Sequence, residues 1–145
     1  MKHGIRTQRH LVMKWKWKEP AMENGKVRTF QDLIVWQKAH ALTLNVYGAT
    51  KGFPSDERYS ITSQIRRAAY SVPANIVEGH SRKGKKEFQQ FLSIAAGSLS
   101  ELRYFLMLSK DLGYLEPHAF EELWKDAEEV GRILFSFSRS LNASR

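Results

Sequence analysis

Residues 117–141, PHAFEELWKDAEEVGRILFSFSRSL, decide the fold. Their apolar members recur every three or four positions without an error: Phe120, Leu123, Ala127, Val130, Leu134, Phe137 and Leu141. This spacing places the apolar side chains on one face of an α-helix, and heptad-like stripes are typical of helices that cross at the shallow angles of a bundle. Pro117 suits the first helical position, where an amide would have no helical partner. The stretch therefore predicts a long bundle helix that begins at Pro117.

Three earlier segments carry comparable stripes, and the first predicts a helix from about Thr29 to Lys51-Gly52. Thr29 and Asp32 have the spacing of a capping box, in which each side chain reaches an otherwise unpaired backbone amide. Pro54 blocks continuation of the helix. The predicted apolar face consists of Leu33, Trp36, His40, Leu44 and Tyr47.

The second segment predicts a helix from Ser55 to Gly79 that contains Pro73. Its stripe is Ile61, Ile65, Ala68, Val72 and Ile76. Proline removes one helical hydrogen bond, but the stripe keeps its phase across Pro73, so we expect a bent, continuous helix. We also expect Asn75 or a nearby polar side chain to bind the carbonyl that loses its partner.

The third segment predicts a helix from Lys85 to Leu112, closed by Gly113 in the left-handed conformation. Its stripe is Phe88, Phe91, Ala95, Leu99, Leu102, Leu106 and Ser109. The connections are only a few residues long, which forces neighbouring helices to be antiparallel. The sequence thus predicts an all-α domain over residues 29–145, an antiparallel up-down-up-down four-helix bundle.

Residues 1–28 contain eight basic and two acidic residues, whereas residues 29–145 contain fifteen basic and thirteen acidic ones. The net charge of +8 therefore belongs mainly to this first segment. Because it lacks helical or strand periodicity, we interpret it as a disordered basic tail. The alternative is an arm whose Lys14-Trp15-Lys16-Trp17-Lys18 run grips phosphates and stacks on bases.

Several functional classes find no support in the sequence. The chain has no cysteine, which excludes disulfides and thiolate chemistry, and it has neither a signal peptide nor an apolar run of about 18 residues. We therefore expect a cytoplasmic protein.

No glutamate has a histidine three residues later, as a di-iron bundle needs. Gly79–Lys86 approaches a P-loop, but Lys86 replaces the required hydroxyl and the segment follows a helix. Gly97-Ser98 lacks the rest of a nucleophile elbow, and we expect both residues to permit close helix contact. We expect no enzyme, catalytic residue, cofactor or metal site.

One candidate site is a cluster of basic residues at the turn between the second and third predicted helices, with two arginines more than three helical turns earlier. Its members are Arg82, Lys83, Lys85, Lys86, Arg66 and Arg67. Charges at this density attract phosphate, helped by the positive end of the following helix. The alternative is a solvated loop without a ligand.

A second candidate is a set of polar residues beside the stripes of the same two helices. Its members are Gln64, Arg67, Asn75, Glu78, Ser98 and Glu101. Buried polar groups are mostly hydrogen-bonded scaffolding, so we favour a structural motif, for example a buried Arg67–carboxylate pair that fixes helix register. The alternative is a polar seam between subunits.

These same residues carry a resemblance. The segments are Phe30-Gln-Asp-Leu33-x-Val-Trp36-Gln-Lys-Ala39, Gln64-Ile-Arg-Arg-Ala-Ala69, Ser71-Val-Pro-Ala-Asn75-Ile-Val-Glu78-Gly79, Glu87-Phe88-x-x-Phe91-Leu92 and Gly97-Ser98-x-x-Glu101-Leu102. Over residues 29–141 the chain resembles the four-helix bundle proteins encoded in intervening sequences of bacterial 23S rRNA genes. A related group comprises accessory proteins of diversity-generating retroelements, which engage a reverse transcriptase and nucleic acid. The resemblance implies a homopentamer with a nucleic-acid role and no catalytic residues. Gly84 stands where the family often has a serine.

Two functional hypotheses follow. The first is a non-enzymatic, oligomeric protein that binds nucleic acid, with RNA preferred. The second is a protein-interaction scaffold or adaptor, for example for a reverse transcriptase or a ribosome-associated factor. Apolar residues outside a single stripe predict self-association into a ring, and the number of five subunits comes from the resemblance. These residues are Ile34, Val35, Trp36 and Tyr47 in the first helix and Ile94, Phe105 and Leu108 in the third.

Overall fold

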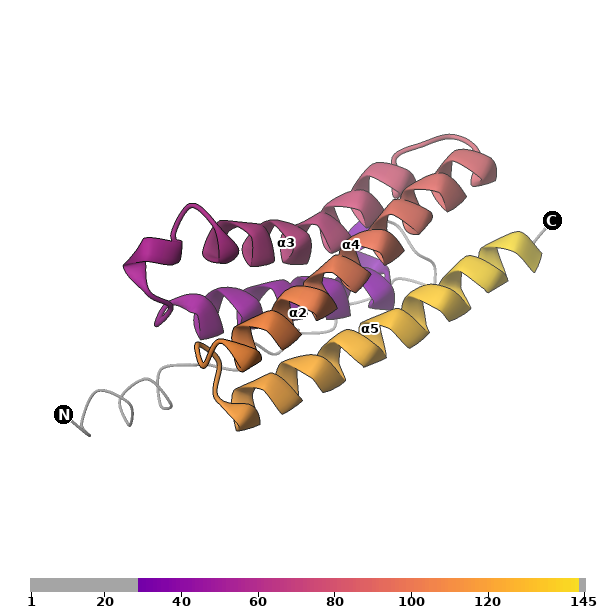
Figure 1. Cartoon of the computed structure of the whole chain (residues 1–145). Coiled ribbons are helices and arrows are strands. Elements are labelled where there is room, and N and C mark those ends of the chain that lie inside the picture. The colour runs from indigo at the N-terminus through magenta and orange to yellow at the C-terminus, as the bar shows by residue number, and fades with distance from the viewer. Residues whose placement is uncertain (1–28, 144–145) are drawn as a thin grey trace.

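The computed structural model describes residues 29–143. Four α-helices lie side by side in it (Figure 1): α2 (Ile34–Thr50), α3 (Ile61–His80), α4 (Lys85–Asp111) and α5 (Pro117–Ala143). Two short 3-10 turns, η2 (Phe30–Asp32) and η3 (Ser55–Glu57), precede α2 and α3. Residues 29–143 contain no strand, so the prediction of an all-α fold with four helices is confirmed for this part of the chain. The predictions for residues 1–28 lie outside it.

Each helix contacts two others through a pair of residues. The pairs are Thr43–Ala69 between α2 and α3, Ser71–Ser98 between α3 and α4, Gln89–Ser138 between α4 and α5, and Lys38–Glu129 between α2 and α5. These four contacts close a square in which α2 lies diagonally across from α4. The apolar core fills the space between the four helices.

The predicted stripes of α3, α4 and α5 form most of this core. All five stripe residues of α3 are buried, and in α5 the buried stripe residues are Leu123, Ala127, Val130 and Leu134. Phe120, Phe137 and Leu141 are half-buried and pack against the core from the two ends of α5. In α3 and α5 the apolar residues lie on one face, so the periodicity alone identified the buried side. In α4 the predicted stripe is also the buried side, although Ile94, Tyr104 and Met107 are exposed on other faces.

The predicted core face of α2 is only partly right. The central buried stripe is Val35, Ala39, Leu42 and Val46, whereas His40 and Leu44 are half-buried and Tyr47 is 37% exposed. Leu33 and Trp36 are buried as predicted. The error has a physical cause: α2 has a single Lys, Arg, Asp or Glu in 17 residues, namely Lys38. When a helix has apolar residues on almost every side, several different sets of residues at helical spacing are equally good candidates for the core-facing stripe.

Both early helices begin later than predicted. Thr29 N donates to Asp32 Oδ2 at 3.1 Å, but this pair caps η2, because Leu33 is extended and separates η2 from α2. In the same way, Ser55 opens η3, and Ser60 leaves the helical region before α3 begins. Ser60 Oγ bonds Glu57 Oε1 at 3.0 Å, a local side-chain bond of the kind that competes with helix formation.

Pro73 lies inside α3, which continues through it as predicted. Proline has no amide to donate to the Ala69 carbonyl, four residues earlier. Thr43 Oγ1 of α2 donates to that carbonyl at 3.0 Å. Asn75 Nδ2 donates to Ser71 O at 2.7 Å instead, so the role predicted for Asn75 is wrong. The true partner comes from another helix, and no local pattern in the sequence points to it.

The boundaries of α4 and α5 agree with the sequence. Gly113 has φ +78°, the left-handed conformation predicted for it, and Tyr114 N donates to Ser109 O at 2.9 Å. This turn satisfies carbonyls at the end of α4. Pro117 is the first residue of α5, also as predicted.

Candidate nucleic-acid interface

The ends of α3 and α4 approach closely at Gly79. A Cβ atom at this position would lie 2.8 Å from Phe88 Cδ1 and 2.8 Å from Phe91 Cβ, so any larger residue would clash. Gly79 was predicted to end the helix, but it lies inside α3, which extends to His80. Its function is to permit the close packing that brings residues 81–84 into a tight turn.

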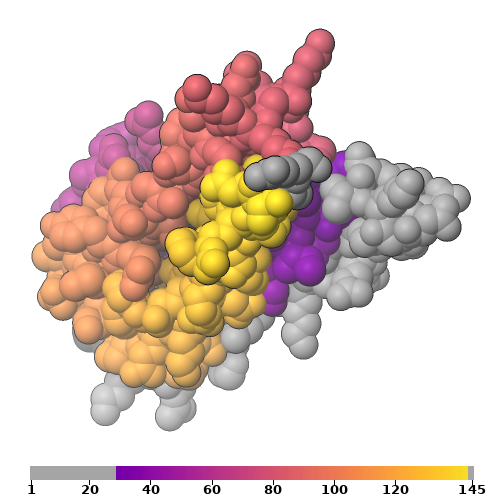
Figure 2. Space-filling view, turned by 90° about the vertical axis from the view of Figure 1, so that its right-hand side faces the viewer, coloured from indigo at the N-terminus to yellow at the C-terminus, as the bar shows by residue number. Residues whose placement is uncertain are grey.

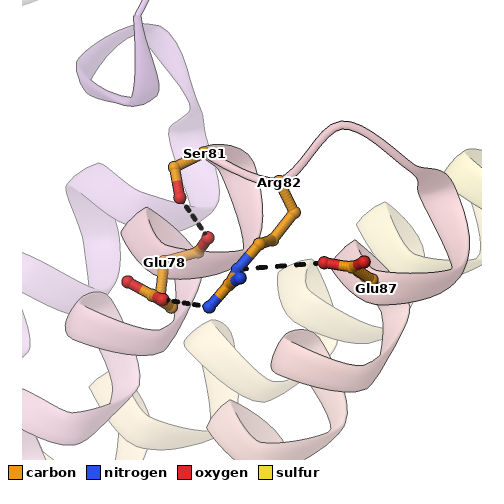
Figure 3. Close-up of polar contacts among 4 residues, drawn as sticks. All are labelled: Glu78, Ser81, Arg82 and Glu87. Atoms are coloured by element: carbon orange, nitrogen blue, oxygen red, sulfur yellow. Dashed lines mark hydrogen bonds and ion pairs between the residues drawn. The ribbon is translucent and has the colours of Figure 1, made fainter.

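Arg82 forms a clamp across this turn (Figure 3). Its Nη2 atom lies 2.5 Å from Glu78 Oε1, on the last turns of α3, and its Nε atom lies 3.9 Å from Glu87 Oε2, at the start of α4. The guanidinium carbon also lies 5.0 Å from the ring centroid of Phe91. Two carboxylates therefore balance the charge of Arg82, which leaves it less able to bind phosphate than its position in the sequence suggests.

The other three basic residues of the turn are free. Lys83, Lys85 and Lys86 are exposed, and within residues 29–143 none of them forms an ion pair. Figure 2 shows this end of the bundle: the turn between α3 and α4, in rose, projects beside the end of α5, in yellow. Lys83 on the turn and Lys85 and Lys86 at the start of α4 thus place three unpaired ammonium groups within four residues at one end of the bundle.

The start of α4 adds to this positive potential. Gly84 is the residue before the helix, and no side chain caps the amides of the first turn. Unpaired amides at a helix start carry a partial positive charge and can donate to phosphate oxygens. The turn therefore combines free lysines with free backbone donors.

Arg66 and Arg67 lie elsewhere. Arg66 Nε donates to Thr50 Oγ1 at 2.9 Å and its guanidinium carbon lies 4.7 Å from the Tyr47 ring centroid, so Arg66 joins α3 to the end of α2. Arg67 is exposed and forms no ion pair within the described residues, so the predicted buried Arg67–carboxylate pair is wrong. About 20 Å of helix separates Arg67 from His80, the last residue of α3 before the turn that contains Arg82.

The predicted polar motif is only partly assembled. Ser71 Oγ accepts from Asn75 Nδ2 at 3.0 Å and lies 2.8 Å from Ser98 Oγ, so Ser71 links Asn75 of α3 to Ser98 of α4. Ser71 was not among the predicted members of the motif, although it lies four residues before Asn75 and therefore on the same helix face. The remaining members, Gln64, Glu78 and Glu101, are exposed, and Glu78 belongs to the Arg82 clamp.

Gly97 differs from its neighbour Ser98. Ser98 contacts α3 as expected, but a Cβ atom at Gly97 would meet nothing within 4 Å. The prediction that Gly97 permits close helix contact is therefore wrong within one copy of the bundle.

We also searched the described residues for a cluster of side chains that could bind a metal ion. Residues 29–143 contain no group of three or more His, Cys, Asp or Glu side chains that could hold a metal ion. His40 stacks on Trp36 with ring centroids 4.9 Å apart and an interplanar angle of 9°. Burial lowers the pKa of His40 from its usual 6.5, which favours the neutral ring.

The bundle corresponds to a known sequence family. The sequence model of the family described as 23S rRNA-intervening sequence protein matches residues 31–136. The chain belongs to this family. Its match includes the whole turn with Lys83, Lys85 and Lys86, and it excludes residues 1–28. A search of curated proteins finds none that matches the chain.

Among solved structures, this family member is similar to a protein of unknown function from the S23 ribosomal protein family of Bacteroides thetaiotaomicron. The TM-score is 0.68 at 23% sequence identity, and the alignment covers 73% of this chain and 96% of the other. At this identity the similarity establishes a shared fold alone.

Proposed function

We propose that this family member is a non-enzymatic, oligomeric protein that binds nucleic acid through Lys83, Lys85 and Lys86. The observation that carries the proposal is the presence of three exposed, unpaired lysines beside the uncapped start of α4. Lysine–phosphate contacts release counterions from the nucleic acid, and this release is a main source of affinity. Arg82 has a smaller part, because Glu78 and Glu87 compete with phosphate for its guanidinium.

RNA is the nucleic acid that we favour. The description of the family names the 23S rRNA intervening sequence, and an RNA partner fits the expected cytoplasmic location. We assign no catalytic residue, cofactor or metal ion to this function.

The proposed assembly would present several copies of the lysine-containing turn to one RNA molecule. We propose that each chain is an antiparallel up-down-up-down bundle and that five chains form a ring. The Gln89–Ser138 bond supports the antiparallel order, since it joins the first turns of α4 to the last turns of α5. In a ring of equally oriented subunits every lysine turn lies on the same rim, and simultaneous contacts raise a weak single-site affinity.

The test compares RNA binding before and after removal of these charges. Residues 1–28 carry more net charge than the turn, so all proteins should begin at Met22. We expect the combined change of Lys83, Lys85 and Lys86 to glutamine to weaken binding to structured RNA by about tenfold or more. The control changes Lys51, Lys110 and Lys125, which removes the same charge at other positions and should leave binding nearly unchanged. Equal binding by the two triple variants would refute the lysine turn as the binding site.

A specific observation also favours the scaffold hypothesis. Ile94, Tyr104 and Met107 are large apolar residues of α4 that are half or nearly half exposed, at 52%, 58% and 46%. Exposed apolar side chains in numbers are typical of protein-binding surfaces. If the protein that begins at Met22 binds no RNA at all, an adaptor, for example for a reverse transcriptase or a ribosome-associated factor, becomes the better account.

A further inference from the structure

Two tyrosines and two arginines gather where α2 and α3 lie side by side (Figure 1). Tyr47 belongs to the last turn of α2, whereas Arg66, Arg67 and Tyr70 belong to α3. The guanidinium carbon of Arg66 lies 4.7 Å from the ring centroid of Tyr47, which joins the two helices at this point. Tyr70 follows Arg66 by four residues and Arg67 by three, and these spacings place side chains on the same side of a helix. We call these four residues the tyrosine–arginine surface.

Both tyrosine rings of this surface are accessible to a ligand. Tyr47 is 37% exposed and Tyr70 is 47% exposed. The π face of a tyrosine ring is a surface on which a nucleobase stacks, and so is the plane of an arginine guanidinium. Arg66 and Tyr47 therefore form one stacking unit, and Tyr70 provides a second ring nearby on α3.

Neither arginine is neutralised by a carboxylate in the described part of the chain. Arg66 Nε donates to the Thr50 hydroxyl at 2.9 Å, and within residues 29–143 neither Arg66 nor Arg67 forms an ion pair. α2 has no acidic residue, and the acidic residue of α3, Glu78, lies two turns beyond Tyr70 and pairs with Arg82. The surface thus combines unpaired positive charge with accessible aromatic rings.

Positive charge interleaved with aromatic rings is the chemistry by which proteins bind single strands of nucleic acid. The bases of a duplex are already stacked on one another, so a tyrosine reaches only the bases of an unpaired strand. We propose that the tyrosine–arginine surface binds single-stranded RNA. Tyr70 and the Arg66–Tyr47 pair stack on bases, and Arg67 contacts phosphates. The choice of RNA over DNA rests on the proposed function, but the site is separate from the lysine turn.

The other exposed tyrosines lie beside carboxylates. Tyr59 is 88% exposed and Tyr104 is 58% exposed. Tyr59 comes directly after Asp56, Glu57 and one arginine, and Tyr104 lies three residues after the exposed Glu101, on the same side of α4. Carboxylates repel phosphate, so an exposed tyrosine alone does not make this kind of site. Tyr104 therefore provides a matched control for Tyr70.

The first test measures the affinity of the full-length protein for a single-stranded RNA of about 12 nucleotides by fluorescence anisotropy. Tyr70→Ala should weaken binding by about fivefold or more, because one stacked base is lost. Tyr70→Phe keeps the ring and should bind like the unmodified protein, as should Tyr104→Ala. Circular dichroism and melting temperature establish that the variants fold. Equal weakening by Tyr70→Ala and Tyr104→Ala would overturn the proposal.

Duplex RNA of the same length separates stacking from charge. Tyr70→Ala should leave the affinity for the duplex unchanged, because the duplex has no free base for this ring. Arg67→Gln should weaken binding to both RNAs, since it removes a phosphate contact. A loss of the same size with duplex and single strand in Tyr70→Ala would show that Tyr70 does not act by stacking.

A site-specific readout is needed because residues 1–28 carry most of the net charge and include Trp15 and Trp17. RNA that contains iodouridine crosslinks under ultraviolet light to aromatic side chains in contact with the base, and mass spectrometry identifies the crosslinked residue. We expect crosslinks at Tyr70 or Tyr47 of the full-length protein. Crosslinks confined to other residues would exclude the tyrosine–arginine surface.

The outcomes separate this inference from the proposed function. The combined change of Lys83, Lys85 and Lys86 to glutamine should leave the crosslink at Tyr70 or Tyr47 in place. If this crosslink forms but the triple change does not weaken binding to structured RNA, only the lysine turn is wrong. If the triple change weakens binding and neither tyrosine crosslinks, only the tyrosine–arginine surface is wrong.

Discussion

At the residue scale, the Ala69 carbonyl oxygen shows how the fold accommodates Pro73. Thr43 has one hydroxyl proton and lies near two acceptors, Ala39 O at 2.9 Å and Ala69 O at 3.0 Å. Ala39 O belongs to the regular helix of α2, whereas Pro73 supplies no amide to Ala69 O. The hydrogen bond from Thr43 therefore contributes chiefly by satisfying the Ala69 carbonyl, and it joins α2 to α3 at this point.

Thr43→Val keeps the shape of the side chain and removes the donor. We expect it to lower the free energy of unfolding by about 1–3 kcal/mol, the cost of leaving a buried carbonyl unsatisfied. In the Pro73→Ala background, where the substituted alanine would supply the missing amide, the same change should cost clearly less. Urea unfolding of the four proteins measures this coupling. An identical cost in both backgrounds would show that Thr43 does not serve the Ala69 carbonyl.

Gly79 and Gly97 form a matched pair, because both lie inside helices. Gly79→Ala should lower the free energy of unfolding by about 1–3 kcal/mol, since its Cβ would collide with Phe88 and Phe91. Gly97→Ala meets nothing within 4 Å, and the better helix propensity of alanine should raise stability by up to about 1 kcal/mol. Thermal unfolding checks both. Equal effects of the two changes would contradict the close approach of α3 and α4 at Gly79.

His40 should make stability depend on pH. Burial lowers the pKa of His40 in the folded protein, so on acidification the unfolded chain takes up the proton first. Stability should therefore fall as the pH drops below about 6.5, until His40 is protonated in the folded state as well. His40→Phe keeps a ring against Trp36 and removes the proton. The stability difference between the two proteins should change in this pH range, and a constant difference would contradict the assignment.

At the element scale, the turn between α3 and α4 carries the functional proposal, and Glu78 limits its charge. Glu78→Gln removes one of the two carboxylates that hold Arg82 and so frees a cation beside the three lysines. We expect RNA affinity to rise by roughly two- to fivefold, a modest gain because the pair is exposed to solvent. Glu101→Gln, at an exposed carboxylate of α4 away from the turn, is the control. A gain of equal size in both variants would indicate a general charge effect.

How much of each element the sequence predicted depends on how its apolar residues are distributed. The core faces of α3 and α5 were predictable because each helix has one clean stripe. The core face of α2 was not predictable in full. This helix has almost no charged residues, so no polar face marks which side is exposed to solvent. The basic composition of residues 82–86 was visible as well. The pairing of Arg82 with Glu78 and Glu87 was not predicted, because it depends on how closely Gly79 lets two helices approach.

At the scale of the whole molecule, a nearly neutral bundle has its densest group of basic residues at one end, where residues 82–86 contain four of them. The described bundle contains nearly equal numbers of basic and acidic residues, so overall charge cannot explain affinity for RNA. We therefore attribute the proposed affinity to the local arrangement of Lys83, Lys85 and Lys86, which a ring would repeat on one rim. The central claim is therefore that these three lysines contact phosphates.

The salt dependence of RNA binding tests this claim most directly. The measurement compares two proteins that both begin at Met22, one unmodified and one with glutamine at positions 83, 85 and 86. For each, the logarithm of the binding constant is plotted against the logarithm of the salt concentration. Each lysine–phosphate contact contributes about 1 to the magnitude of the slope, so the account predicts a slope shallower by about 3 per bound turn in the glutamine variant. Parallel lines for the two proteins would contradict it.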